Sequence, residues 1–183
     1  IILVIRSFFY TVGLLKKRKL NAKVISVGNL TVGGTGKTPM VIAIAEILTR
    51  KNKKTAVLSR GYKSSKEGKL RIVSDGNEIK LDPASAGDEP YLIAERLKGV
   101  SVLICPNRYE SGRYAIDNFG SDTIILDDGF QNLAIKKDFD ILLIDAMNPF
   151  GSGYLLPRGI LREPLSAIKR ADIIVITKAD SHK

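Results

Sequence analysis

Cysteine and histidine are almost absent from this chain of 183 residues. The single cysteine, Cys105, excludes an internal disulfide framework and a zinc site built from several cysteines, and it fits a reducing compartment such as the cytoplasm. The single histidine, His182, lies next to the last residue, which disfavours catalysis centred on histidine. The chain also lacks internal repeats, low-complexity tracts and a clear linker, so we expect one domain or one domain with an appendage.

Acidic residues are missing from the front of the chain, where none precedes Glu46. Overall, 29 Lys and Arg stand against 19 Asp and Glu, a formal net charge of +10. This excess indicates an anionic partner, which could be nucleic acid, a phosphorylated small molecule or an anionic membrane surface. Hydrophobic residues make up 44% of the chain, which allows a sizeable core and excludes disorder and collagen-like repeats.

No apolar run reaches the roughly 20 residues that a membrane-spanning helix needs, because Arg6 interrupts the first about 15 residues. Apolar residues nevertheless recur there at steps of four and three, which is a helical stripe, and the basic run 16–19 follows it. We therefore predict that residues 1–20 form an amphipathic helix at a membrane interface, with its basic end near anionic headgroups. A helix packed on the core is the alternative.

After residue 20, short β-branched runs alternate with helical patterns, which predicts an α/β fold with a parallel sheet covered by helices on both faces. Strands are predicted at 23–28, 55–59, 101–104, 122–126, 140–144 and 172–177, with a further short one at 69–73. Helices are predicted at 38–51, 89–98, 108–118 and 165–170. In such sheets ligands bind at the carboxyl ends of the strands, so residues just after each strand matter most.

A glycine-rich loop follows the first predicted strand and leads into the first predicted helix, which is the setting of a phosphate-binding P-loop. Lys37 would reach the β- and γ-phosphates, and the Thr38 hydroxyl would ligate Mg²⁺. Thr31 stands where the usual pattern has a glycine. The predicted nucleotide-binding residues are Gly33, Gly34, Thr35, Gly36, Lys37 and Thr38. This loop makes residues 21–183 a P-loop NTPase-like domain, but it does not distinguish a kinase from a switch or a motor.

Acidic residues stand at two further strand or helix ends. Asp127 and Asp128 follow a strand, as the Mg²⁺-holding acid of P-loop enzymes does, and only one of the two needs to face the metal. Asp88 lies in Gly-Asp-Glu-Pro, where the local pattern favours a helix N-cap over a catalytic role. Which of these roles Asp88 has remains open at this level.

Arginines suited to phosphate follow two other strands, as Arg60 and Arg108. A proline-punctuated loop carries Arg158 and Arg162. The segment 177–180, Thr-Lys-Ala-Asp, is similar to the guanine-recognition signal of GTPases and supports a rival interpretation, a P-loop GTPase acting as a switch or metallochaperone.

Five motifs, taken in order, resemble the tetraacyldisaccharide 4′-kinase family, the lipid A kinases of Gram-negative bacteria. They lie at residues 28–39, 59–62, 87–90, 127–131 and 161–165. The resemblance implies ATP- and Mg²⁺-dependent phosphorylation of the 4′-hydroxyl of a tetraacylated glucosamine disaccharide 1-phosphate, at the cytoplasmic face of the inner membrane. It also implies that Asp88 is the catalytic base and that Asp127 and Asp128 belong to the metal and nucleotide site.

Further expectations follow from the resemblance. Arg60, Arg108 and Gln131 are the candidates for contact with the lipid substrate, and nucleic acid becomes the least supported partner. The family commonly has histidine where this chain has Asn132, whose side-chain amide can also donate a hydrogen bond. Family members are longer and have a second lobe, so the chain resembles an N-terminal lobe.

Overall fold

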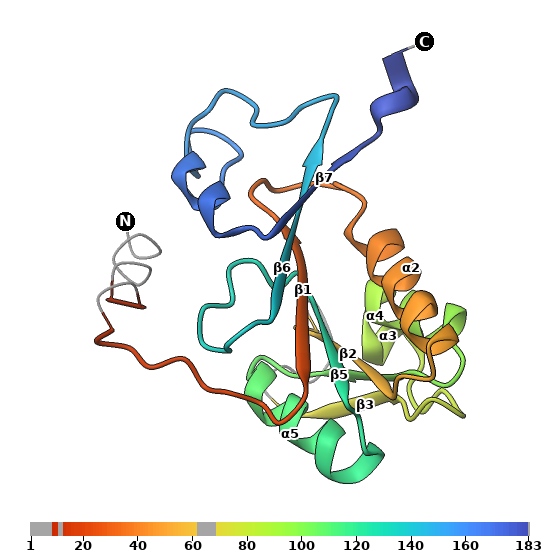
Figure 1. The fold of residues 1–183 in the computed structure, drawn as a ribbon. Helices are drawn as coiled ribbons and strands as arrows, with labels where there is room; N and C mark the ends of the chain where they lie inside the picture. Colours follow the sequence, from red (N-terminus) through yellow and green to blue (C-terminus); the bar gives the residue numbers. More distant parts are fainter. Residues whose placement is uncertain (1–8, 11–12, 62–68, 183) are drawn as a thin grey trace.

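The computed structural model of the chain describes residues 9–10, 13–61 and 69–182. A seven-stranded sheet crosses the molecule in the order β3-β4-β2-β5-β1-β6-β7 (Figure 1). The strands are β1 (Lys23–Asn29), β2 (Thr55–Ser59), β3 (Arg71–Ser74), β4 (Ser101–Ile104), β5 (Thr123–Asp127), β6 (Phe139–Asp145) and β7 (Ile173–Thr177). Every predicted strand is therefore confirmed: β2 and β4 have the predicted ends, and the ends of the other strands differ by at most two residues.

All neighbouring strands pair in parallel except β3 and β4, which are antiparallel. The prediction of a parallel sheet is thus correct for six strands and wrong for this one edge. Residues 60–70, which join β2 to β3, are fewer than the dozen or more that a parallel crossover needs. The chain therefore returns along the sheet edge in the opposite direction.

Helices cover both faces of the sheet, as predicted. They are α2 (Lys37–Arg50), α3 (Pro83–Ala86), α4 (Asp88–Arg96) and α5 (Arg108–Phe119), followed by the 3₁₀ segments η1 (Leu165–Arg170) and η2 (Ala179–His182). Alternate strand residues point to opposite faces, so Val57 and Ile125 pack with α2 and α4, whereas Leu58 and Ile124 pack with α5. The short helix α3 is not among the predicted elements.

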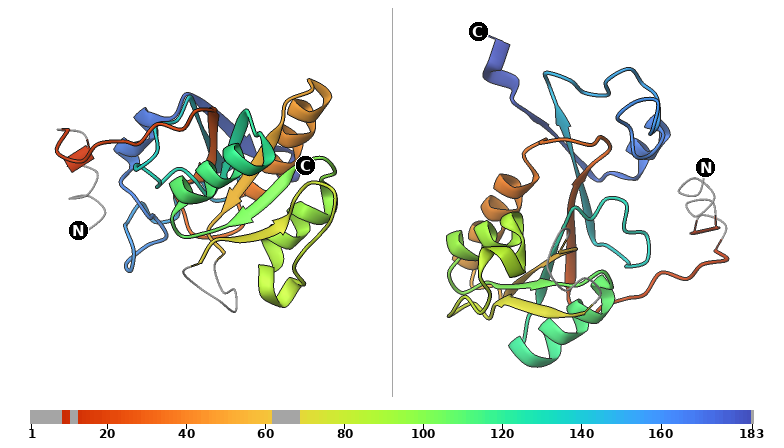
Figure 2. Two further views of the ribbon diagram at one scale, coloured as in Figure 1. Left: turned by 90° about the horizontal axis from the view of Figure 1, so that it is seen from below. Right: turned by 180° about the vertical axis from the view of Figure 1, so that it is seen from behind.

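The long connection between β6 and β7, residues 146–172, lies at the opposite end of the molecule from α5 (Figures 1 and 2). It returns to the P-loop, because Leu161 bridges Thr31 and the Val32 N–H donates to the Ile160 carbonyl at 2.9 Å. This connection therefore forms a wall beside the carboxyl end of the sheet.

The predicted N-terminal helix falls largely on residues 1–8, 11 and 12, which lie outside the described residues. Phe9 and Tyr10 are helical, whereas residues 13–20 are not, so the basic run does not continue a helix. Its backbone instead pairs with a loop: the Arg18 N–H donates to the Ala134 carbonyl at 2.7 Å. Among the described residues, none of the helices combines the length and apolarity needed to cross a membrane.

Strand β7 lies at one edge of the sheet and is poorly covered on both faces. Ile173 is 45% exposed, Ile174 49% and Ile176 63%, although successive side chains point to opposite faces. Apolar area on this strand thus remains in contact with water in the described part of the chain.

Two glycines allow the segment after β5 to pack directly against β1. A Cβ atom at Gly28 would lie 2.7 Å from the Cβ and the nitrogen of Phe130, and one at Gly129 would lie 2.7 Å from Ser26 Oγ. Both distances are too short for real contacts. Close approach of the two backbones therefore requires glycine at both positions.

Replacing Gly28 with alanine is expected to lower the free energy of unfolding by about 1 to 3 kcal/mol, because Phe130 is fully buried and cannot retreat. Urea titration measures this change. Gly34→Ala is the matched control, since a Cβ there meets nothing within 4 Å. Equal stability of the Gly28→Ala variant and the wild-type protein would contradict the packing described here.

Candidate active site

The P-loop connects β1 to α2 at the carboxyl end of the sheet, as predicted, and α2 begins at Lys37, one residue before the expected start. Gly36 has φ +79° and Gly33 has φ +122°, conformations that favour glycine. Added Cβ atoms at Gly33 and Gly34 would meet nothing within 4 Å, so the loop faces open space there. The loop thus has the shape and the room to surround a phosphate group.

Lys37 points back from the start of α2 over the end of β1. Its Nζ lies 3.5 Å from Asn29 Oδ1 and 3.8 Å from the Asp128 carboxylate. Thr38, the next residue, is half-buried in the first turn of α2. The predicted phosphate-binding lysine and one of the two predicted acids therefore occupy one site.

Asp128 is held by Arg162, which comes from the connection between β6 and β7. The two guanidinium nitrogens donate to the two carboxylate oxygens at 2.8 and 2.6 Å, and one of them also donates to Asn29 Oδ1 at 2.6 Å. Burial raises the pKa of Asp128, but the hydrogen bonds and charge of Arg162, helped by Lys37, outweigh burial and lower it. Asp128 is therefore ionised and already paired.

Arg162 is a site residue that the sequence did not single out. The signals were its place in one of the five family motifs, at residues 161–165, and its place with Arg158 in a proline-punctuated loop, to which no role was assigned. Its side chain lies across the end of β1, and its backbone N–H donates to the Leu30 carbonyl at 2.7 Å. The connection is therefore attached to the base of the P-loop at this residue.

Asp127 differs sharply from its neighbour. It is only 1% exposed, its Oδ2 accepts a hydrogen bond from Ser59 Oγ at 2.9 Å, and its buried Oδ1 has no partner among the described residues. Burial raises the pKa of Asp127 to about 6, and the negative charges of Glu89 and Asp128 add to this effect. A buried carboxylate oxygen without a partner fits a Mg²⁺ ligand, since this ion prefers oxygen donors.

Arg108 is buried at the start of α5, where its guanidinium lies 3.5 Å from the Cys105 and Pro106 carbonyl oxygens. Burial lowers its pKa, whereas attraction to Asp127 and Asp128 opposes this change. Arg60 follows β2 and is exposed, and its positive charge also lowers the pKa of Arg108. The two predicted arginines therefore lie on the acidic side of the site, one buried and one open to solvent.

Asp88 is the first residue of α4 and is exposed. The N-cap is Gly87, with φ +87°, so the local interpretation of Asp88 as a cap is wrong. Gly87 also ends α3, and only a glycine easily adopts the turn that both helices require. Asp88 is therefore not used in capping, and its neighbour Glu89 is near enough to raise the pKa of Asp127.

Gln131 and Asn132, which follow Asp128 in the sequence, form hydrogen bonds within the protein and do not face open space. The Gln131 side-chain nitrogen donates to the Asn29 carbonyl at 2.9 Å. Asn132, which replaces the family's usual histidine, accepts a hydrogen bond from the Ala134 N–H at 3.1 Å and closes a turn. In this structure both residues stabilise the segment beside β1.

Residues 177–180, which are similar to a guanine-recognition signal, lie next to the P-loop. The Thr177 hydroxyl donates to the Thr35 carbonyl at 3.1 Å, and Lys178 Nζ lies 2.5 Å from Asp145 Oδ2. The lysine of this segment is thus engaged in an ion pair with the end of β6.

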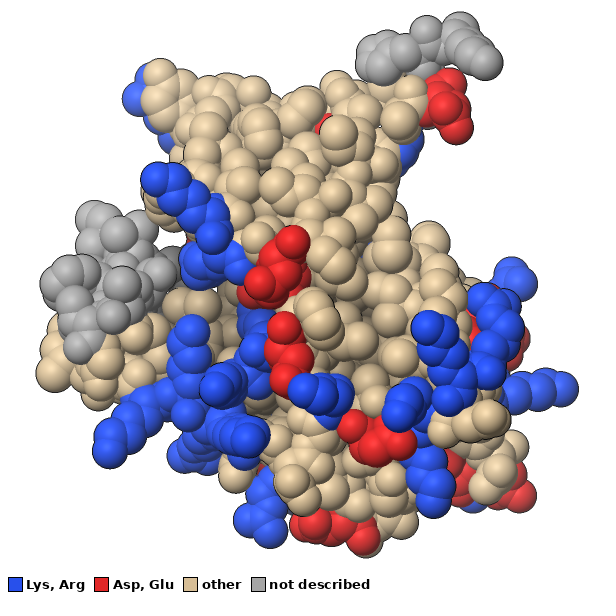
Figure 3. Space-filling model, viewed as in Figure 1, with Lys and Arg blue, Asp and Glu red and all other residues tan. Residues whose placement is uncertain are grey.

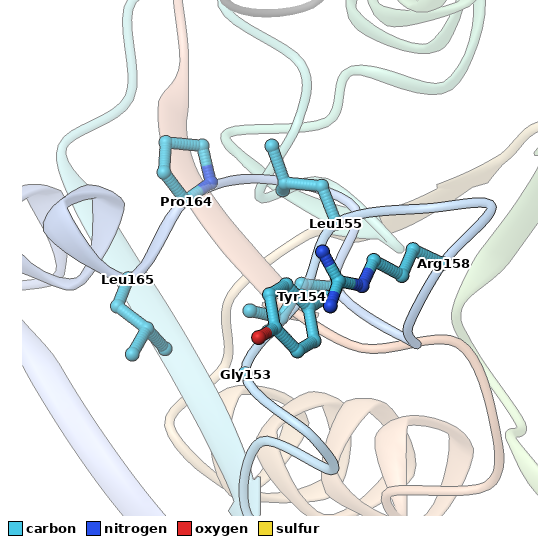
Figure 4. A pocket seen from close by; sticks show the side chains of 7 residues that line it. Gly153, Tyr154, Leu155, Arg158, Pro164 and Leu165 are labelled. Carbon is cyan, nitrogen blue, oxygen red and sulfur yellow. The ribbon is translucent and has the colours of Figure 1, made fainter.

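An open hollow of about 530 Å³ lies in the connection between β6 and β7 (Figure 4). Its wall is mainly apolar, and the Arg158 guanidinium stacks on the Tyr154 ring, 3.7 Å from the ring centre. Leu161, next to Arg162, forms part of the wall and links the hollow to the site. The lining residues are Gly153, Tyr154, Leu155, Arg158, Leu161, Pro164 and Leu165.

The burial of Asp127 predicts an unusual pH dependence of stability. Because its pKa is about 6 in the folded protein, against 3.8 for an ordinary aspartate, folding takes up a proton between these values, and stability falls as the pH rises through this window. Asp127→Asn is expected to remove that slope and to raise the free energy of unfolding at pH 7 by about 2 to 3 kcal/mol. Urea titrations with a chelator at several pH values measure both effects.

Asp128→Asn is the matched control, because the ionised form of Asp128 is stabilised and its pKa is lowered. This second substitution is expected to lower stability at pH 7. An Asp127→Asn variant that is less stable than the wild-type protein at pH 7 would show that the Asp127 carboxylate is not destabilised by burial.

The chain was compared with known proteins. The family model for tetraacyldisaccharide-1-P 4′-kinase matches residues 1–183. The tetraacyldisaccharide 4′-kinase of Halothermothrix orenii is 49% identical over 180 residues, which are 98% of this chain and 47% of that protein. The protein of the same name from Geobacter metallireducens is 49% identical over 174 residues, which are 95% of this chain and 52% of that protein.

A solved structure agrees with these matches. The crystal structure of the "apo" form of LpxK from Aquifex aeolicus in complex with ATP has a TM-score of 0.91 and 44% identity, and it covers 99% of this chain and 56% of that chain. The α/β P-loop fold predicted from the sequence is thereby confirmed. This chain spans about half the length of the curated relatives it matches. From the family model, the identities and the shared fold, the chain belongs to the tetraacyldisaccharide-1-P 4′-kinase family.

Proposed function

We propose that the protein transfers the γ-phosphoryl group of ATP to the 4′-hydroxyl of a tetraacyldisaccharide 1-phosphate. The observation that carries this proposal is the meeting of the P-loop, Lys37 and the acids 127–128 at one end of the sheet, in a chain of this kinase family. The ATP in the solved relative supports the choice of nucleotide. The GTPase alternative is not favoured, since the matched relatives are kinases.

In this proposal the P-loop N–H groups and Lys37 hold the β- and γ-phosphates of ATP. Asp127 Oδ1, which has no hydrogen-bond partner in the described part of the chain, and the Thr38 hydroxyl would hold Mg²⁺, with Asp128 nearby. A bound Mg²⁺ would neutralise charge that develops on the transferred group. Because Asp128 is already paired with Arg162, Asp127 is the better metal ligand of the two.

Asp88 takes the proton from the attacking sugar hydroxyl. Its exposure at the first turn of α4 leaves the carboxylate accessible to a substrate, and no capping bond occupies it. Arg60, also exposed, contacts substrate phosphate. The buried Arg108 instead attracts Asp127 and Asp128 electrostatically. Gln131 can contact the substrate only if its hydrogen bond to the Asn29 carbonyl breaks. We therefore propose that its main role is to support the P-loop.

We propose that the protein works at the cytoplasmic face of the bacterial inner membrane, which the resemblance to the family implies. A membrane surface suits a lipid substrate, because moving acyl chains into water costs about 0.8 kcal/mol per CH₂. Lysines and arginines gather in two areas of the face shown in Figure 3, and the one at the lower left is on the side where the N-terminal segment runs. Exposed lysines there include Lys16, Lys17, Lys19 and Lys136. We therefore propose that residues 1–20 form a membrane-associating segment and that residues 21–183 form the kinase core.

Lys37→Met and Asp88→Asn are expected to inactivate phosphoryl transfer from ATP to the lipid disaccharide, measured with the intact protein. Removal of the base lowers kcat by about 10²- to 10⁴-fold. Removal of Lys37 is expected to be at least as damaging, because charge neutralisation dominates in a loose transition state.

Glu95→Gln is the matched control, since Glu95 is an exposed acid on the same helix α4. Full activity of the Asp88→Asn variant would defeat the assignment of the base. Running each assay with ATP and with GTP tests the rival, because a GTPase switch requires a strong preference for guanine.

Replacing Lys16, Lys17 and Lys19 together with glutamine is expected to weaken binding to anionic vesicles. At about 1 kcal/mol for each basic residue near the surface, the three substitutions together are expected to weaken binding by somewhat more than about 100-fold at low salt. Vesicle co-sedimentation measures it, and neutral vesicles serve as the control. Unchanged binding of the triple variant would remove the basic run from the proposed membrane contact.

A further inference from the structure

The hydroxyl of Thr177, at the end of β7, hydrogen-bonds to the P-loop, which comes from a distant part of the sequence. Its Oγ1 lies 3.1 Å from the Thr35 carbonyl oxygen and 3.4 Å from the Ile144 carbonyl oxygen. A hydroxyl has one proton to donate, and the shorter distance identifies Thr35 as the better acceptor. A side chain from the far end of the sequence therefore holds one peptide group of the loop.

That peptide group joins Thr35 to Gly36. In a planar trans peptide the carbonyl and the next N–H point in opposite directions. A carbonyl held toward β7 therefore directs the Gly36 N–H away from β7. This N–H makes no hydrogen bond within residues 9–10, 13–61 and 69–182, so it is available to a ligand.

The other branch of Thr177 packs against the same place. An added Cβ at Gly36 would lie 3.7 Å from Thr177 Cγ2, so the methyl group sits beside the glycine whose φ is +79°. The hydroxyl thus bonds to one residue of this peptide bond, and the methyl group lies beside the other. Together they restrict its rotation.

Thr177 is itself held firmly, although β7 is an exposed edge strand. It pairs with Asp145 in the parallel register of β6 and β7, and its carbonyl accepts the Ala146 N–H at 2.9 Å. The next residue, Lys178, forms the ion pair with Asp145. The end of β7 is therefore fixed to β6 on the side that faces the P-loop.

We propose that Thr177 is a positioning residue that orients the Thr35–Gly36 peptide so that the Gly36 N–H donates to a phosphate oxygen of the bound nucleotide. The inference rests on the proposed function, because it requires the loop to hold a nucleotide phosphate. It gives residues 177–178 a role other than recognition of guanine. Thr177 supports the loop, and Lys178 secures the strand end that carries it.

Three substitutions test this role in the intact protein. Thr177→Val keeps the shape and removes the hydroxyl, Thr177→Ser keeps the hydroxyl, and Ile176→Val changes the neighbouring exposed residue. Binding of inorganic tripolyphosphate, ATP and adenosine is measured by titration, together with kcat, KM for ATP and the thermal midpoint.

Thr177→Val is expected to weaken binding of tripolyphosphate and of ATP by the same factor, about 2- to 10-fold, which corresponds to one hydrogen bond. KM for ATP is expected to rise more than kcat falls, and adenosine binding to stay unchanged. Thr177→Ser is expected to stay within about twofold of the wild-type protein, and Ile176→Val to match it.

Tight tripolyphosphate binding by Thr177→Val overturns the inference, as does an equal loss in Thr177→Ser. An equal loss in Ile176→Val overturns it too, because the effect then comes from the edge strand in general. If the wild-type protein binds neither ATP nor tripolyphosphate, the proposed function fails and this inference with it. Normal binding by both wild type and Thr177→Val removes the inference alone.

Discussion

The pair formed by Arg162 and Asp128 joins three segments that are far apart in the sequence. Arg162 comes from the connection between β6 and β7, Asp128 follows β5, and Asn29, which also accepts from Arg162, ends β1. Loss of Arg162 would leave the partly buried Asp128 with the more distant Lys37 at 3.8 Å, and loss of Asp128 would leave Arg162 with the neutral Asn29, so either change is destabilising. The pair therefore ties the P-loop, the acids and the wall beside them to one another at a single point.

A second group of charges lies behind this pair. Arg170 and Lys137 both approach the buried ring of Phe130, at 4.6 and 5.6 Å from its centre. Arg170 is paired with Glu163 and Lys137 with Asp140. Each cation is thus neutralised and also contacts an aromatic ring, so the residues following Asp128 rest on a base that is rigid and uncharged overall.

The sheet was largely predictable because its information is local. Runs such as 55–59 and 101–104 are short and contain β-branched residues, and the structure has strands at the same positions. The direction of β3 was not predictable from its own residues, because it depends on the length of the connection before it. Helix α3 has only four residues, too few to show a period.

The site was predictable in composition but not in pairing. The sequence placed Lys37, Asp127 and Asp128 together, because parallel strands end at one edge. It could not separate the two acids, since their difference arises from the backbone: Asp128 has φ +50°, which turns it toward Arg162 while Asp127 stays in the strand.

The exposed isoleucines of β7 have a practical consequence. In the described part of the chain this strand ends the sheet with an unpaired edge, and such an edge is a template for intermolecular strand pairing, so concentrated solutions of the 183-residue chain are prone to aggregate.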